Sequence, residues 1–180
     1  MASATGERAM GEFIIEVLSR DQLRYVYPLV REAFPTLDLS GWLRFGRQLT
    51  GPRRTGQCGI VAARREGRVF PCGLFCYRVE DDLELGKVLI ADHFVAIDLL
   101  NPAVVLAALV EELDHLAKRL DCQAVRSLVH GGTREVAGGL FAAGHQPDDS
   151  ALLLKKLLEP TPRRGARAHA RAGMPSTVAH

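Results

Sequence analysis

The stretch that decides the fold is KVLIADHFVAIDLLNP, residues 87–102, together with the amphipathic run that follows it to Asp121. Its first part is β-branched, aliphatic and aromatic over more residues than a typical strand needs, which predicts a long, largely buried strand. Asn101 and Pro102 then predict a helix start, with Asn as the N-cap and Pro at the first helical position, where its missing N–H costs nothing. From Ala103 onward the apolar residues recur at three- and four-residue spacing, which indicates a helix with one buried face.

The junction between this strand and this helix is a candidate anion site. The first N–H groups of a helix have no partner within the helix, and they lie beside the positive end of its dipole. We therefore expect a phosphate or another anion to bind near the start of the helix.

The remaining elements follow from apolar patterns and turn residues on either side. Before the central strand, the sequence predicts a strand at Phe13–Leu18, a helix from about Arg20 to Phe34 capped by Ser19, a short helix capped by Asp38 or Ser40, and strands Cys58–Arg65 and Val69–Val79. After the central helix it predicts a strand at Ala124–His130, a helix from Thr133 to Gly144 and a final strand at Ala151–Leu158. This order indicates an α+β fold, a mixed sheet of about six to seven strands flanked by about four helices.

Composition and length indicate one domain. The chain has 180 residues, and we expect a flexible N-terminus over residues 1–11, a single domain over 12–159 and a disordered basic tail over 160–180. The tail carries four arginines and no acid, so the rest of the chain is slightly acidic. That charge balance argues against nucleic acid as a partner.

Membrane and metal partners are not expected either. No apolar run approaches the roughly 20 residues that a membrane helix needs, and we see no signal peptide, so we expect a cytoplasmic protein. Cys72 and Cys76 lie in a strand-like run, too far apart for one disulfide or one metal ion, and no paired C-x-x-C pattern occurs. The cysteines are interpreted as buried thiols, with no metal site.

The order of elements over about residues 13–158 resembles the GNAT superfamily of acyl-CoA-dependent N-acyltransferases. LFAAGHQP at 140–147, followed by Leu154-Lys-Lys, resembles the family's helix, Gly-aromatic turn and closing strand, and residues 95–102 resemble its pantetheine strand and pyrophosphate loop. The resemblance implies a GNAT-like fold, acetyl-CoA or another acyl-CoA as co-substrate, and a small-molecule or peptide amine as acceptor. A homodimer stays open.

The resemblance also implies which residues would meet acyl-CoA. The pantetheine would pair with the strand, and the pyrophosphate would lie at the loop and helix start, so the implied contacts are Val95, Ala96, Ile97, Asn101, Ala103, Val104, Val105 and Phe141. Asn101, Val104 and Leu106 stand where the family carries Gln or Arg and two small residues. Leu140 or Phe141 stands where it often carries a general-acid tyrosine.

The acid–base candidates are Asp92, His93 and His130. Asp92 and His93 are adjacent inside the apolar strand, and adjacent strand residues point to opposite faces, so we expect only one of them to face the cleft. A structural polar pair is the alternative. Asp98 ends the strand, and we expect it to accept hydrogen bonds from loop amides. Trp42, Phe45 and Tyr25 either line an acceptor pocket or pack in the core.

Three functions therefore stay open. The first is acyl transfer from acyl-CoA to an amine by direct attack, assisted by a general base. The second is a non-catalytic acyl-CoA sensor or interaction domain, which the missing glycines and tyrosine favour. The third is an acyltransferase with an acyl-carrier-protein donor, because Val104 and Leu106 suit an apolar chain.

Overall fold

The computed structural model describes residues 8–10, 12–51, 56–98, 101–129 and 134–147. Its strands form one six-stranded sheet in which the spatial order of the strands is their order along the chain. The strands are β1 (Arg8–Met10), β2 (Phe13–Val17), β3 (Cys58–Arg65), β4 (Pro71–Asp82), β5 (Gly86–Ala96) and β6 (Ala124–Ser127). Neighbouring strands are antiparallel except β5 and β6, which are parallel. The predicted mixed sheet is confirmed.

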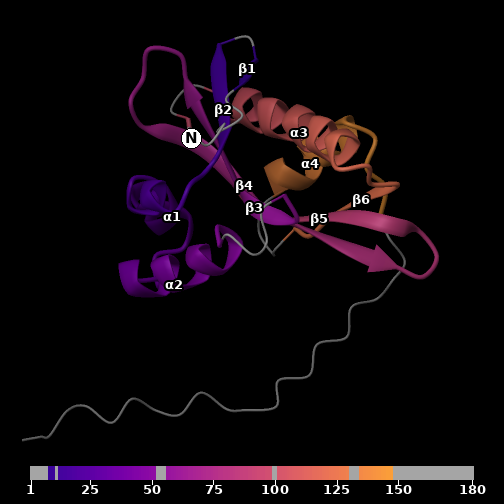
Figure 1. Cartoon of the computed structure of the whole chain (residues 1–180). Coiled ribbons are helices and arrows are strands. Elements are labelled where there is room, and N and C mark those ends of the chain that lie inside the picture. The colour runs from indigo at the N-terminus through magenta and orange to yellow at the C-terminus, as the bar shows by residue number, and fades with distance from the viewer. Residues whose placement is uncertain (1–7, 11, 52–55, 99–100, 130–133, 148–180) are drawn as a thin grey trace, which may run out of the picture. The chain divides into compact units, whose positions relative to one another are not determined.

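Helices cover both faces of this sheet (Figure 1). A 3-10 turn, η1 (Asp21–Arg24), precedes α1 (Tyr27–Ala33) and α2 (Leu39–Leu49), which pack on one face, whereas α3 (Pro102–Arg119) and α4 (Arg134–Ala142) pack on the other. Alternate side chains of one strand pack into the apolar clusters on the two faces of the sheet. Ile60 and Ala62 of β3 belong to the cluster with α1 and α2, whereas Val61 and Ala63 belong to the cluster with α3. A sheet covered on both faces explains why β3 and β5 read as nearly continuous apolar runs.

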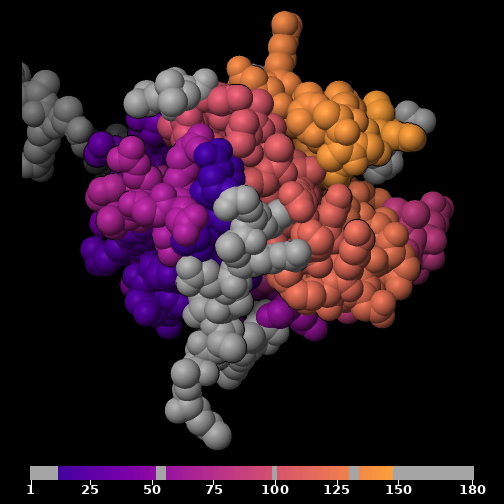
Figure 2. All heavy atoms as spheres, turned by 90° about the horizontal axis from the view of Figure 1, so that it is seen from above, coloured from indigo at the N-terminus to yellow at the C-terminus, as the bar shows by residue number. Residues whose placement is uncertain are grey.

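The long helix α3 lies directly on the sheet at a glycine. A Cβ on Gly73 of β4 would come within 2.6 Å of Val105 Cγ1 and 2.9 Å of Leu109 Cδ1. A glycine also permits α4 to pack closely on α3, because a Cβ on Gly139 of α4 would lie 2.5 Å from Leu106 Cδ2. The surfaces of α3 and α4 adjoin in the view from above (Figure 2).

The predicted helix from Arg20 to Phe34 is wrong in its first half. The chain forms the 3-10 turn η1, and α1 begins only at Tyr27, with Pro28 in its first turn. Proline has no N–H to donate and disfavours helical geometry in the residue before it, so it marks a start and not an interior position. Ser19 does not cap a helix; its backbone N–H and its hydroxyl both donate to Gln22 Oε1, at 2.7 and 2.9 Å.

Other boundaries also differ from the predictions. Strand β4 begins at Pro71, and Asp82 is its last residue, with the turn over residues 83–85; Asp82 Oδ1 accepts from the N–H groups of Glu84 and Leu85. Within the segment 1–11 predicted to be flexible, residues 8–10 form β1. The predicted strand 151–158, the tail 160–180 and His130 lie outside the described residues.

The described residues up to Gln146 form one compact unit. Among the described helices, none has the length and apolar character needed to cross a membrane.

Candidate active site

A β-bulge in the central strand β5 shapes the site. The β4–β5 register pairs Leu74 with Val95 and Cys76 with Asp92, so Phe75 alone stands opposite His93 and Phe94. His93 adopts a φ of 54°, in the left-handed region that residues other than glycine seldom enter. The extra residue interrupts the alternation of side chains along the strand.

The bulge brings Asp92 and His93 together. Asp92 Oδ1 lies 2.7 Å from His93 Nδ1, and Cys76, directly opposite Asp92 in the register, belongs to the cluster on the α1–α2 face. The two side chains thus do not point to opposite faces as regular strand alternation would have it, although of the pair only His93 is among the residues that line the cavity beside α1 and α2. A bulge is the physical reason, because one inserted residue returns the next side chain to the same face.

The Asp92 carboxylate is held on both oxygens. Oδ1 meets His93, and Oδ2 accepts from Arg78 Nη1 at 3.0 Å, while Arg78 Nε is paired with Glu80 Oε1 at 2.6 Å. Only 13% of the Asp92 side chain is exposed, against 34% for His93. A carboxylate at Nδ1 fixes the tautomer and the orientation of an imidazole.

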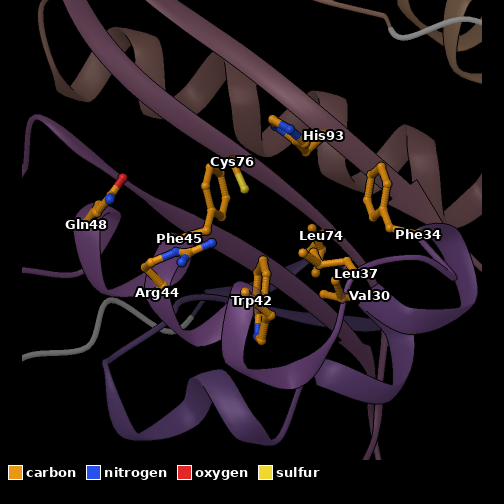
Figure 3. Close-up of a pocket in the computed structure, with 11 residues that line it drawn as sticks. Val30, Phe34, Leu37, Trp42, Arg44, Phe45, Gln48, Leu74, Cys76 and His93 are labelled. Atoms are coloured by element: carbon orange, nitrogen blue, oxygen red, sulfur yellow. The ribbon is translucent and has the colours of Figure 1, made fainter. Parts of the chain in front are cut away.

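His93 forms part of the wall of a cavity of about 450 Å³ between the sheet and helices α1 and α2. Its ring lies between those of Phe34 and Phe45, with centroid separations of 5.9 and 5.3 Å. Trp42 completes this wall and is anchored by its indole N–H, which donates to the Leu23 carbonyl at 2.7 Å. Figure 3 shows these side chains converging on one space.

Sequence reasoning identified part of this cavity. Trp42 and Phe45 line it, as one of the two interpretations had it, whereas Tyr25 stacks on Phe70 with ring centroids 6.2 Å apart and is not among the lining residues. Phe34 and Arg44 were missed as lining residues. Phe34 follows Val30 by four residues, and Arg44 follows Gly41 by three and precedes Gln48 by four; a packed core would show the same helical spacing.

Cys76 lies beneath the imidazole and is buried. Burial raises the pKa of the Cys76 thiol well above its ordinary value, and the negative charge of Asp92 acts in the same direction. The thiol therefore stays protonated at neutral pH, which argues against a role as nucleophile.

The donor atoms of Cys76, Asp92 and His93 lie within 4.8 Å of one another, a spacing compatible with a metal ion. Sequence reasoning missed this grouping because it arises across the β4–β5 register. The arrangement suits a metal poorly, since both Asp92 oxygens are already engaged and the guanidinium of Arg78 would repel a cation at that carboxylate.

The side of β5 that faces β6, away from β4, carries backbone groups without a described strand partner. Strand β6 pairs with Val88–Ala91, and the Leu128 N–H donates to the Ala91 carbonyl at 2.8 Å. Past this point, no described strand pairs with residues 92–96 on the β6 side. Backbone groups at such an edge can pair with an extended, amide-containing ligand.

The predicted donor contacts on β5 differ in what they present. The side chain of Val95 is buried under α1 and α2, Ala96 packs on the α3 side, and the Ile97 N–H donates to the Cys72 carbonyl at 2.7 Å. The backbone N–H of Ile97 is thus already committed to β4.

At the start of α3, the predicted contacts divide into surface and core. Ala103 and Val104 are exposed, whereas the side chain of Val105 is fully buried and packs against Gly73, so it cannot touch a ligand at the surface. Phe141 of α4 is 55% exposed.

Asn101 does not cap α3 with its side chain, contrary to the prediction. Its own N–H donates to Asp98 Oδ1 at 2.9 Å, while Asp98 Oδ2 accepts from Arg65 Nε at 2.9 Å. The expectation that Asp98 accepts from a loop amide is confirmed. The ion pair with Arg65 also offsets the negative charge that Asp98 places beside the helix start.

Comparison with known proteins defines the fold. No protein-family model and no curated protein sequence matches the chain. Among solved structures, aminoglycoside N-acetyltransferase AAC(6')-Iy in complex with CoA is 12% identical, with a TM-score of 0.67 over 87% of this chain and 100% of that one. Glucosamine-6-phosphate N-acetyltransferase from Arabidopsis thaliana is 14% identical, with a TM-score of 0.63 over 82% and 99%. Ribosomal-protein-alanine N-acetyltransferase from Brucella melitensis biovar Abortus 2308 is 14% identical, with a TM-score of 0.64 over 80% and 98%. The chain therefore has a GNAT-like fold, the fold of these N-acetyltransferases.

Proposed function

We propose that this protein is an acyl-CoA-dependent N-acyltransferase in which His93 is the general base and Asp92 its positioning residue. The observation that carries the proposal is the bulge, which sets the imidazole in the wall of a cavity with a carboxylate on Nδ1. The fold supports it, because the solved structures of this fold include N-acetyltransferases and a complex with CoA.

In the proposed reaction the acceptor amine lies in the cavity beside His93. Its nitrogen attacks the thioester carbonyl carbon, and His93 Nε2 takes the proton that the nitrogen loses. The carbon–sulfur bond then breaks, and CoA leaves as a thiolate, which takes up the proton that His93 removed, directly or through water, so that the imidazole is regenerated. Backbone N–H groups of the strand would polarise the carbonyl oxygen while it carries negative charge.

The acyl-CoA donor would lie along residues 92–96 of β5, on the side that faces β6, and reach the start of α3. The absence of a described strand partner for residues 92–96 on that side, together with the exposed residues Ala103 and Val104 at a helix N-terminus, supports this location. Pro102 offers no N–H, and the Val104 side chain occupies space that glycine would leave to a phosphate. We therefore expect weaker pyrophosphate binding than a glycine-rich loop gives.

The test separates chemistry from donor binding. His93→Gln should lower kcat by about 100-fold, the usual contribution of a positioned base, while the rise in melting temperature caused by acetyl-CoA should persist. His115→Gln is the matched control, because His115 lies on α3 and contacts Glu111 rather than the cavity. Unchanged turnover in His93→Gln would refute the assignment of the base.

A second candidate is a non-catalytic acyl-CoA sensor, favoured by Pro102 and Val104 at the helix start. It predicts that acyl-CoA raises the melting temperature although no amine is acylated. His130, the third acid–base candidate, lies outside the described residues, and its role stays a prediction to be tested by His130→Gln.

A further inference from the structure

We infer that the cavity beside His93 takes a free amino acid with a large apolar side chain, preferably aromatic, and that Arg44 binds its carboxylate. This inference rests on the proposed function in making that amino acid the acceptor. The binding preference itself can be measured without turnover.

The walls of the cavity select for an apolar group. The rings of Phe34, Trp42 and Phe45 line it together with the aliphatic side chains of Val30, Leu37 and Leu74. Contact with these surfaces removes apolar area from water, and aromatic rings add favourable tilted or offset packing with other rings. A sugar or a polyamine would instead lose hydrogen bonds to water in such surroundings.

The charge of the cavity disfavours a polycation. Among the described lining residues no carboxylate occurs, and Asp92 is committed to Arg78 and to His93. Residues 20–50, which include both helices of this face, hold five arginines and three acids. A ligand with several ammonium groups would therefore meet a positive surface, whereas a carboxylate would be attracted.

Arg44 is placed to supply that attraction. It lines the cavity from α2, next in sequence to Phe45, and its nitrogen-bearing end points toward the other lining side chains (Figure 3). Within the described part of the chain it forms no ion pair that would compete for the guanidinium. A guanidinium matches a carboxylate with two parallel N–H donors, which a lysine could not do.

The three groups of an α-amino acid thus find three counterparts. The amine meets His93, the side chain meets the aromatic wall, and the carboxylate meets Arg44. An arylalkylamine without a carboxylate would lack the contact with Arg44. A polyamine would lack the contact with the aromatic wall and would be repelled by Arg44.

Binding can be measured by calorimetry in the presence of CoA, which carries no acyl group and therefore allows no reaction. The probes are L-phenylalanine, phenethylamine, which is the same molecule without the carboxylate, and neamine, a polyamine. We expect L-phenylalanine to bind most tightly. Arg44→Gln should weaken its binding about tenfold, the low end for a charge-assisted pair because Arg44 is exposed, and should leave phenethylamine unaffected.

Arg47→Gln is the matched control, since Arg47 follows on the same helix but lines a separate surface hollow with Arg20 and Arg24. An equal effect of both variants, tighter binding of phenethylamine or neamine, or no binding of any probe would overturn the inference. Mass spectrometry after addition of acetyl-CoA then tests the proposed function separately. Binding with the expected pattern but without N-acetylphenylalanine would refute the transferase and keep the binding preference, whereas His93-dependent acetylation of neamine in preference to L-phenylalanine would do the reverse.

Discussion

Gly73→Ala tests the close packing of α3 on β4. The new Cβ would lie 2.6 Å from Val105 Cγ1, 2.9 Å from Leu109 Cδ1 and 3.1 Å from the Val95 carbonyl oxygen. Two of these contacts are closer than real Cβ atoms tolerate, so the Val105 and Leu109 side chains, or α3 together with them, must shift. Overpacking of this kind costs about 1–3 kcal/mol of unfolding free energy, and we expect the upper half of that range because the backbone oxygen cannot move aside.

Urea denaturation of three variants measures this cost. Val105→Ala alone should cost about 0.5–2.5 kcal/mol through lost burial, but combined with Gly73→Ala it should cost less than the sum of the two single changes, because it removes the closest clash. Gly138→Ala in α4 is the control; its Cβ meets nothing within 4 Å, and it should be neutral or stabilise by up to about 1 kcal/mol through helix propensity. A neutral Gly73→Ala, or strict additivity in the double variant, would refute the close approach of α3 to β4.

Three further predictions follow from single contacts. Asp98→Ala should lower the free energy of unfolding by about 1–2 kcal/mol through loss of the Arg65 and Asn101 contacts, whereas Asn101→Ala should cost less than about 0.5 kcal/mol. If urea denaturation shows a larger cost for Asn101→Ala than for Asp98→Ala, the Asn101 side chain caps α3 after all. Asp92→Asn should lower kcat about tenfold without changing the shift in melting temperature with acetyl-CoA, and equal loss of both would indicate a structural role alone. Burial raises the pKa of the Cys76 thiol in the folded protein. The stability that the protonated thiol contributes is therefore complete below the unfolded-state pKa of about 8.5 and is lost as the pH rises above it. The unfolding free energy should consequently fall less between pH 8 and pH 10 in Cys76→Ala than in the wild type.

The long elements of the fold were predictable because each has one dominant period. The spacing of apolar residues in 103–121 predicted α3, which spans Pro102–Arg119. The gap between the predicted strands Cys58–Arg65 and Val69–Val79 holds the β3–β4 turn, where Gly67 adopts a φ of 71°. The α1 start was not recognised because the apolar spacing continues across Pro28, and the helix boundary that a proline marks was not considered there.

The candidate site was predictable in composition but not in geometry. A polar pair inside an apolar strand drew attention to Asp92 and His93, yet nothing in the sequence marks the bulge, since the residue in the left-handed region is His93 and not a glycine. The N-cap was also misassigned: Asn101 is a common capping residue, but its side chain forms no cap, and its own N–H donates to Asp98, three residues earlier. Both errors concern which of several permitted local hydrogen bonds forms, and the answer depends on tertiary contacts.

The agreement between strand order and chain order has a consequence for how the molecule assembles. Helices α1 and α2, the segment that joins them, and strands β4 and β5 contain every described residue that lines the cavity beside His93. During synthesis these residues leave the ribosome before α3 and β6, and their antiparallel pairings involve neighbouring strands only. The parallel β5–β6 pair must wait for the whole of α3. We therefore expect the cavity beside His93 to form early in folding, and the β6 side of β5 to be among the last parts to gain protection from hydrogen exchange.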